Sequence, residues 1–126
     1  MIDATRPAAR ALVVEDEELV REILIWAFED LGFEVTVASS GDEAAGMFRS
    51  TAQFDVLFTD IRMPGAIDGW TLAEKAREVS PALPVIYASG FSSEPPRQVP
   101  QSVFLQKPLR TDALRQALIA LGMPIS

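Results

Sequence analysis

The sequence predicts an α/β fold, a doubly wound parallel sheet of five strands in the order 2-1-3-4-5. Short apolar runs alternate with amphipathic helical segments along the whole chain, as they do where right-handed helical crossovers join the strands. Runs such as Val56-Leu57-Phe58 are continuously apolar, which is typical of strands covered on both faces. With 126 residues, 48% of them hydrophobic, the chain has the size and composition of one domain with its own core.

The folded domain is predicted at residues 11–122. Residues 1–10 include several polar residues and a proline, so we expect a flexible lead-in, and residues 123–126 are assigned to a tail. A first strand is predicted at residues 11–14, an apolar run that ends on Glu15-Asp16-Glu17. The domain therefore begins with a strand that finishes in carboxylates.

A first helix is predicted at residues 17–31, because apolar residues recur there at helical spacing and Gly32 can take the left-handed conformation that ends many helices. A short second strand, rich in β-branched residues, follows at residues 33–38. The next helix should extend to about Arg49, since Ser40-Gly41-Asp42-Glu43 has the Ser-x-x-Glu form of a capping box. The side chains expected to face inward from the first helix are Val20, Ile23, Leu24, Ala27 and Leu31.

A buried third strand is predicted at residues 54–60, where the apolar run ends on Asp60 and Pro64-Gly65 then forces a turn. The helix that follows should start after Asp68-Gly69 and stop before Ser80-Pro81. Its expected inward side chains are Leu72, Ala73, Ala76 and Val79, and Trp26 and Trp70 are both interpreted as packing residues.

Two more strands are predicted at residues 84–89 and 103–107, and a last helix at about 111–121. A doubly wound fold would place a further helix in residues 91–102. Three prolines fall in that segment, so it can form about one helical turn at most. The predicted fold therefore has a degenerate fourth helix.

Composition excludes several classes of function. With 18 acidic and 11 basic residues the net charge is -7, so we expect no direct binding to nucleic acid. The chain has no cysteine and no histidine, which excludes disulfides, thiol catalysis, a Ser-His-Asp triad and the usual zinc sites. No apolar run approaches the roughly 20 residues of a membrane span, and residues 1–10 lack the apolar core of a signal peptide. A cytoplasmic location without membrane contact is expected.

In the predicted fold, the order in which strands are added reverses between the first and third strands, which is the topological switch point. Glu15, Asp16 and Asp60 should therefore converge in one crevice there. At about 6 Å and an effective dielectric near 20, each pair of these carboxylates would repel by roughly 3 kcal/mol. A hard divalent cation is the natural compensation. Lys107 and Ser89, at the ends of neighbouring strands, add an ammonium and a hydroxyl. This combination favours transfer of a phosphoryl group to Asp60.

Each of these side chains also has a purely structural interpretation. Asp60 could cap a loop, Ser89 could belong to an ordinary turn, and Lys107 could be a solvated surface residue. Phe104, in the fifth strand, could simply be part of the core. Their convergence at one sheet edge favours the functional interpretation.

From residue 12 to residue 121 the sequence resembles the receiver domains of two-component response regulators, whose fold is flavodoxin-like. The resemblance rests on Val13-Val14-Glu15-Asp16-Glu17, Asp60-Ile61-Arg62-Met63-Pro64-Gly65, Asp68-Gly69, Ser89 and Lys107-Pro108. A narrower resemblance, carried by residues 84–91, is to the mostly stand-alone receivers of alphaproteobacteria with an aromatic-Ala-Thr-Gly-hydrophobic motif, which are related to hybrid-kinase receivers.

The resemblance implies a role for each site residue. Asp60 would accept the phosphoryl group, and Mg²⁺ would be held by Asp16, Asp60 and the backbone carbonyl of Arg62. Glu15, which replaces the commoner Asp, would act on the metal largely through water. Ser89, which replaces the commoner Thr, and Lys107 would bind the phosphoryl oxygens, and Phe104 would be the switch aromatic. A cis peptide bond is implied between Lys107 and Pro108.

The implied function is a phosphorylation-switched signalling receiver rather than an enzyme. Its expected partners are a histidine kinase or phosphotransfer protein and a downstream protein, and no output domain is recognisable. An aspartate-nucleophile phosphatase of the haloacid-dehalogenase type is the first alternative, but it requires a carboxylate two residues after the nucleophile, where this chain has Arg62. A phosphorylation-independent interaction module is the second. For a phosphorylation-switched receiver, we expect phosphorylation to order or reposition residues 91–102.

Overall fold

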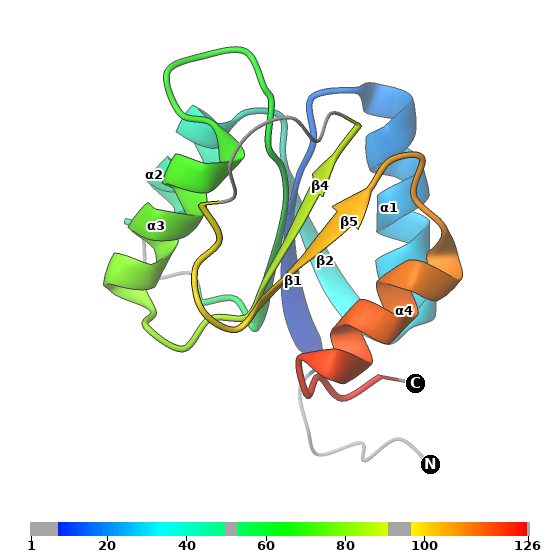
Figure 1. The fold of residues 1–126 in the computed structure, drawn as a ribbon. Helices are drawn as coiled ribbons and strands as arrows, with labels where there is room; N and C mark the ends of the chain where they lie inside the picture. The colour runs from blue at the N-terminus through cyan, green and yellow to red at the C-terminus, as the bar shows by residue number, and fades with distance from the viewer. Residues whose placement is uncertain (1–7, 50–52, 91–96, 126) are drawn as a thin grey trace.

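The computed structural model describes residues 8–49, 53–90 and 97–125, and its centre is a parallel five-stranded sheet in the order β2-β1-β3-β4-β5 (Figure 1). The predicted doubly wound topology is therefore confirmed, and the strand order reverses between β1 and β3. The strands are β1 Ala9–Val14, β2 Phe33–Ala38, β3 Val56–Asp60, β4 Val85–Ser89 and β5 Ser102–Gln106.

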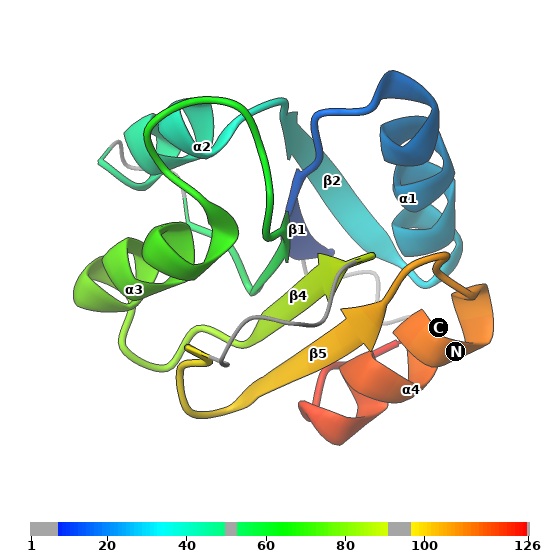
Figure 2. The same cartoon turned by 45° about the horizontal axis from the view of Figure 1, so that its top comes forward.

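Helices cover both faces of the sheet (Figures 1 and 2). In chain order they are α1 Glu18–Asp30, α2 Gly41–Phe48, α3 Gly69–Val79 and α4 Thr111–Ala120. One apolar layer joins α1 and α4 to the sheet, and a second joins α2 and α3 to its other face. Because successive strand residues point to opposite faces, Val13 and Phe58 belong to the first layer, and Leu12 and Leu57 to the second.

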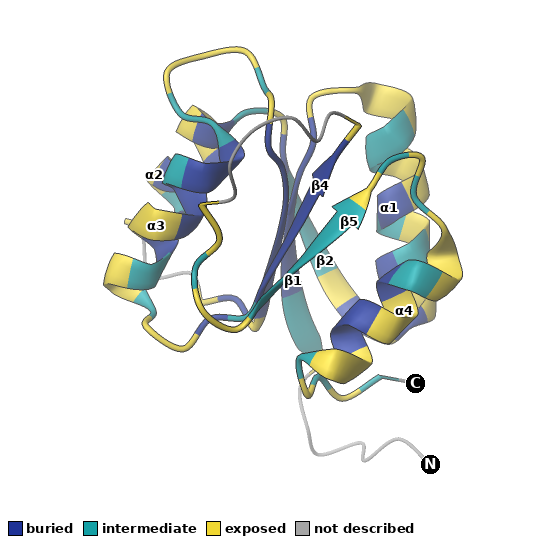
Figure 3. Cartoon of the chain, in the orientation of Figure 1, coloured by how far each residue is buried: buried dark blue, intermediate teal, exposed yellow. Residues whose placement is uncertain are grey.

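The adjacent inner strands β3 and β4 are the most deeply buried strands of the sheet. All five residues of β3 and all five of β4 are buried, whereas the residues of the edge strand β5 are half-buried or exposed (Figure 3). Phe28 of α1 packs edge-on against Phe33 and Phe58, with ring centroids 5.5 and 6.0 Å apart. The continuous apolar runs of the sequence are thus explained by strands with helices on both sides.

Local signals in the sequence set most helix ends. Ser40 Oγ accepts a hydrogen bond from the Glu43 N–H at 3.1 Å, and Glu43 Oε1 accepts one from the Ser39 N–H at 2.8 Å, so α2 begins with the predicted cap. Asp68 caps α3 in the same way through the Thr71 N–H at 2.8 Å. Gly32, after α1, has φ +96°, the left-handed conformation that its position predicted.

Three expectations about packing are wrong. Ile23 and Val79, expected to face inward, are 61% and 60% exposed, and Trp26 is 77% exposed although Trp70 is buried as predicted. On α1 the buried side chains are Leu24, as expected, and Phe28, which was not expected. Helical spacing identified an apolar helix but did not decide which of its apolar stripes faces the sheet.

The limits of the folded part also differ from those expected. β1 begins at Ala9, two residues before the predicted strand, because Ala9 and Arg10 pair with Phe33 and Glu34 of β2. At the other end, Met123 and Ile125 pack against the apolar layer beneath α1 and α4, so these two residues of the expected tail belong to the folded body.

Between β4 and β5, residues 97–101 form no helix, and the described part of the chain has four helices in all, in agreement with the degenerate fourth helix. The first part of this connection, residues 91–96, lies outside the described residues.

The Lys107-Pro108 peptide bond is cis, as the resemblance implied. None of the described helices is long and apolar enough to cross a membrane.

Candidate functional site

Three carboxylates meet at the carboxyl edge of the sheet, where β1 and β3 end. Val14 is paired with Thr59, so the next residues along the two strands, Glu15 and Asp60, come to the same edge. One carboxylate oxygen from each of Glu15, Asp16 and Asp60 lies within 4.8 Å of the other two. Glu15 and Asp60 are buried and Asp16 is exposed. The predicted convergence of these residues is confirmed.

Lys107 supplies the positive charge that was expected beside them. Its Nζ lies 2.8 Å from Glu15 Oε1 and 3.1 Å from Asp60 Oδ2. The backbone positions it there, because the Lys107 N–H donates to the carbonyl of Ser89 at 2.9 Å. Ser89 ends β4 and is only 4% exposed, one residue beyond Ala88, which pairs with Asp60. The hydroxyl and the ammonium therefore both belong to the site edge.

Burial sets the protonation equilibria of the site. It raises the pKa of the Glu15 carboxyl above its ordinary value, although the hydrogen bond from Lys107 acts in the opposite direction. It also raises the pKa of Asp60, against the charge of Lys107 and with a further contribution from the charge of Asp16. For Lys107, desolvation alone would lower the pKa, but the hydrogen bond with Glu15 and the charge of Asp60 raise it. The lysine therefore stays charged, and any added positive charge would favour the ionised form of both buried carboxyls.

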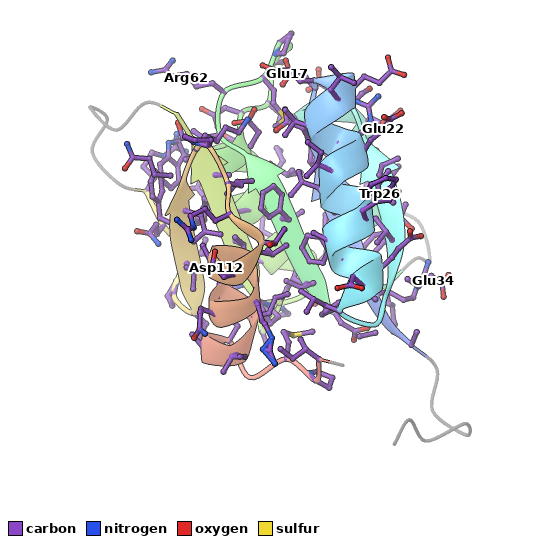
Figure 4. The ribbon with its side chains drawn as sticks, turned by 90° about the vertical axis from the view of Figure 1, so that its right-hand side faces the viewer. Glu17, Glu22, Trp26, Glu34, Arg62 and Asp112 are labelled. Carbon is purple, nitrogen blue, oxygen red and sulfur yellow. The ribbon has the colours of Figure 1, made fainter. Side chains whose placement is uncertain are left out.

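The donor set fits a hard divalent cation. All three converging side chains offer carboxylate oxygens, the ligands that Mg²⁺ prefers, and one of them is exposed to solvent, from which a hydrated ion would arrive. Arg62 follows β3 by two residues, and Figure 4 shows its side chain at the same end of the molecule as Glu17. The use of the Arg62 carbonyl as a further ligand stays a prediction.

Residues 11–119 match the family described as the response regulator receiver domain. The chain belongs to this family. It is thus a receiver domain of two-component signalling, and the resemblance inferred from the sequence is confirmed.

Solved receivers share its fold. A response regulator receiver protein from Sinorhizobium medicae is 35% identical, with a TM-score of 0.84 over 90% of this chain and 94% of that one. The receiver domain of the hybrid histidine kinase CckA is 33% identical, with a TM-score of 0.75 over 90% and 98% of the two chains. TrrA of Thermotoga maritima, solved as a complex with Mg²⁺ and BeF, is 28% identical, with a TM-score of 0.80 over 90% and 98%.

Many curated relatives are longer proteins. The receiver is 31% identical to the transcriptional regulatory protein SphR of Synechococcus elongatus, and the match covers 88% of this chain but only 48% of SphR. It matches 13% of the sensor kinase LuxN of Vibrio campbellii, at 28% identity. The receiver therefore corresponds to one part of these relatives.

Two further contacts of the receiver site were not predicted from the sequence. The Arg21 side chain of α1 donates a hydrogen bond from its Nη1 to the backbone carbonyl of Glu15 at 2.9 Å. The Glu17 N–H donates to Glu15 Oε2 at 3.2 Å, so both carboxylate oxygens of Glu15 have partners. Because of these contacts, the longer side chain at position 15 is fixed in the crevice rather than extended into solvent.

Phe104, the expected switch aromatic of the receiver, lies within an aromatic group on the α3 side of the sheet. Its ring is stacked on Trp70 with centroids 6.5 Å apart, and Trp70 also contacts Tyr87 at 4.7 Å. The strand register pairs Phe104 with Tyr87, two residues before Ser89 on β4. Phe104 is thus half-buried and apart from the carboxylates, and its role in switching stays a prediction.

Proposed function

We propose that this receiver is a phosphorylation switch in which Asp60 accepts a phosphoryl group from a phosphohistidine of a partner histidine kinase or phosphotransfer protein. One observation carries the proposal: a buried carboxylate at a strand end, flanked by two more carboxylates and held by a lysine 3.1 Å away. In the reaction a carboxylate oxygen of Asp60 forms a bond to phosphorus. The bond from phosphorus to the donor imidazole nitrogen breaks, and its electron pair stays on that nitrogen.

The chain's own residues would support each part of this reaction. Asp16 and Asp60 would hold Mg²⁺, and Glu15 would act on it largely through water. When bound, the ion supplies positive charge to the oxygens of the transferring group. Lys107 would exchange its contact with Asp60 for one with a phosphoryl oxygen, and the Ser89 hydroxyl would donate to another. Because both contacts exist only after transfer, they give the phosphorylated state a conformational preference of its own.

Incubation with a small acyl phosphate tests the proposal. The wild-type chain should gain one phosphoryl group in intact-mass spectra when Mg²⁺ is present, and none when Mg²⁺ is removed by a chelator. A chain that gains no phosphoryl group under either condition would instead be the phosphorylation-independent interaction module. Release of inorganic phosphate from many small phosphomonoesters would indicate the aspartate-nucleophile phosphatase.

The exposed side of α1 is where we propose that the phosphodonor docks. Leu19, Ile23 and Trp26 are 76%, 61% and 77% exposed, and with Glu22 and Ile25 they line a groove of about 560 Å³. In Figure 4 Glu22 and Trp26 lie along the same side of α1. The helix begins at Glu18, two residues after Asp16, so the Leu19 end of this apolar groove is only three residues from the acidic crevice along the chain. Apolar side chains grouped in this way are typical of a protein interface.

The acidic side chains of α1 indicate which kind of protein surface fits this groove. The helix that carries the groove has four exposed acidic side chains, Glu18, Glu22, Glu29 and Asp30. A second copy of the chain would place like charges opposite one another, since the only basic residue of α1, Arg21, is bonded to the Glu15 carbonyl. A helical surface with apolar side chains and a basic rim fits instead.

The docking proposal predicts that Ile23→Glu slows phosphotransfer by about tenfold or more, since apolar contacts at an interface centre often contribute that much. The donor is the phosphorylated kinase or phosphotransfer protein that transfers fastest to the wild-type chain, and the rate with a small acyl phosphate should be unchanged. Val79→Glu is the matched control, because Val79 is 60% exposed but lies on α3. Equal transfer rates for the two variants would contradict the assignment of this face. Dissociation of a wild-type dimer by Ile23→Glu, seen by sedimentation, would show a self-association surface instead.

A further inference from the structure

The hydroxyl of Tyr87 links β4 to the segment that follows it. Tyr87 is completely buried, yet its Oη accepts a hydrogen bond from the backbone N–H of Val99 at 3.1 Å. Burial raises the pKa of this phenol, so it stays neutral at physiological pH. A phenol placed inside an apolar layer normally has a polar partner, and here the partner is a backbone group twelve residues further along the chain.

Side chains also hold the rest of residues 97–101. The carbonyl of Val99 accepts a hydrogen bond from Ser102 Oγ at 2.6 Å. The guanidinium of Arg77, on α3, donates to the carbonyls of Pro100 and Gln101, and to that of Leu83 at 2.7 Å. This segment therefore keeps its shape through side-chain bonds where a doubly wound fold ordinarily has a helix.

These bonds attach the segment to two different elements. Arg77 ties it to α3, and an exposed ion pair of 2.8 Å between Arg97 and Glu74 does the same. Tyr87 ties it to β4. Gln101 has φ +57°, an uncommon conformation for a residue other than glycine, so the shape of the segment depends on such external contacts.

We propose that Tyr87 is a positioning residue that couples the phosphorylation site to residues 97–101. Tyr87 and Ser89 point to the same face of β4, two residues apart, so displacement of Ser89 toward a phosphoryl group also displaces the Tyr87 ring. Val99 cannot follow freely, because Ser102 holds its carbonyl and Arg77 holds the carbonyls of the next two residues. The bond between Tyr87 and Val99 is therefore made in the unmodified receiver and lost in the phosphorylated one. This inference rests on the proposed function for its trigger.

The Val99 amide proton reports this bond directly. Hydrogen exchange of ¹⁵N-labelled protein, measured by NMR with and without Mg²⁺ and beryllium fluoride, should show about tenfold faster exchange at Val99 in the activated wild-type chain, the change expected for loss of one hydrogen bond. Tyr87→Phe removes only the hydroxyl. In this variant Val99 should exchange at the fast rate before activation, with no further response, while Asp60 still gains a phosphoryl group in intact-mass spectra.

Glu74→Gln is the matched control, since it weakens an anchor of the same segment on α3 without changing β4. Its Val99 amide should still respond to activation. The coupling would be refuted by a Tyr87→Phe variant in which Val99 stays protected or still responds, or by an unresponsive wild-type chain. If the wild-type chain gained no phosphoryl group at all, the proposed function itself would fail, and the two failures are thereby distinguished.

Discussion

An Asp60→Asn variant is expected to gain no phosphoryl group from an acyl phosphate or from a phosphorylated kinase, with Mg²⁺ present or absent. The reason is chemical, because the amide that replaces the carboxylate is not a nucleophile toward phosphorus at neutral pH. The other groups of the site remain, including the 2.8 Å contact between Lys107 and Glu15. Loss of reaction would therefore report the acceptor atom rather than loss of the site.

Stability separates this result from misfolding. Burial raises the pKa of Asp60, so its contribution to the free energy of unfolding is most favourable below the ordinary carboxyl pKa of 3.8 and declines as the pH rises through the raised folded-state value. At neutral pH the charged carboxylate thus costs stability in the metal-free protein. Asp60→Asn removes that charge, so its midpoint of urea unfolding at pH 7 without Mg²⁺ should equal or exceed that of the wild type.

Asp55→Asn is the matched control. Asp55 lies just before β3, at the end of the strand away from the site, where its side chain accepts a hydrogen bond from the Arg10 N–H at 2.7 Å. This variant should be phosphorylated like the wild type. Phosphoryl gain by Asp60→Asn at the wild-type rate would mean that a different residue is the acceptor.

The sheet and the positions of the carboxylates could be predicted because they depend on short-range signals. Continuous apolar runs locate β3 and β4, and a carboxylate at the end of a parallel strand must lie at the carboxyl edge. Once the strand order is assigned, the meeting of Glu15 with Asp60 follows from topology alone. The side-chain contacts of Lys107 at this edge followed from the same reasoning.

Contacts between distant segments could not be predicted in this way. Val99 follows Tyr87 by twelve positions and Pro100 follows Arg77 by 23, and neither pair has a pattern that periodicity could reveal. On α1 the difficulty was different, because Leu19, Ile23 and Trp26 form one apolar stripe while Leu24 and Phe28 form another. Both stripes have helical spacing, and only packing against the sheet distinguishes the core from an exposed surface.

Gly69→Ala is expected to destabilise the receiver by about 3 kcal/mol, the upper end of the range for forcing an extra carbon into a packed interior. A Cβ at this position would lie 2.3 Å from the backbone oxygen of Asp60 and 2.7 Å from the Cα of Ile61. Both are backbone atoms, which cannot rotate away as a flexible side chain could. The Gly69 N–H also donates to the Ile61 carbonyl at 2.8 Å, so α3 begins directly against the end of β3.

The same substitution at Gly46 provides the control and decides the cause. Gly46 lies within α2, and a Cβ there would meet nothing within 4 Å, so Gly46→Ala should stabilise the chain by about 0.5 to 1 kcal/mol through its better helix propensity. Urea unfolding of both variants measures the two effects with opposite signs.

Gly69→Ala should also slow phosphorylation by the small acyl phosphate, because relief of the clash must move either α3 or the backbone that carries Asp60. A Gly69→Ala chain as stable as the wild type would show that α3 can shift without cost. The close contact between α3 and β3 would then have no part in holding Asp60 at the sheet edge.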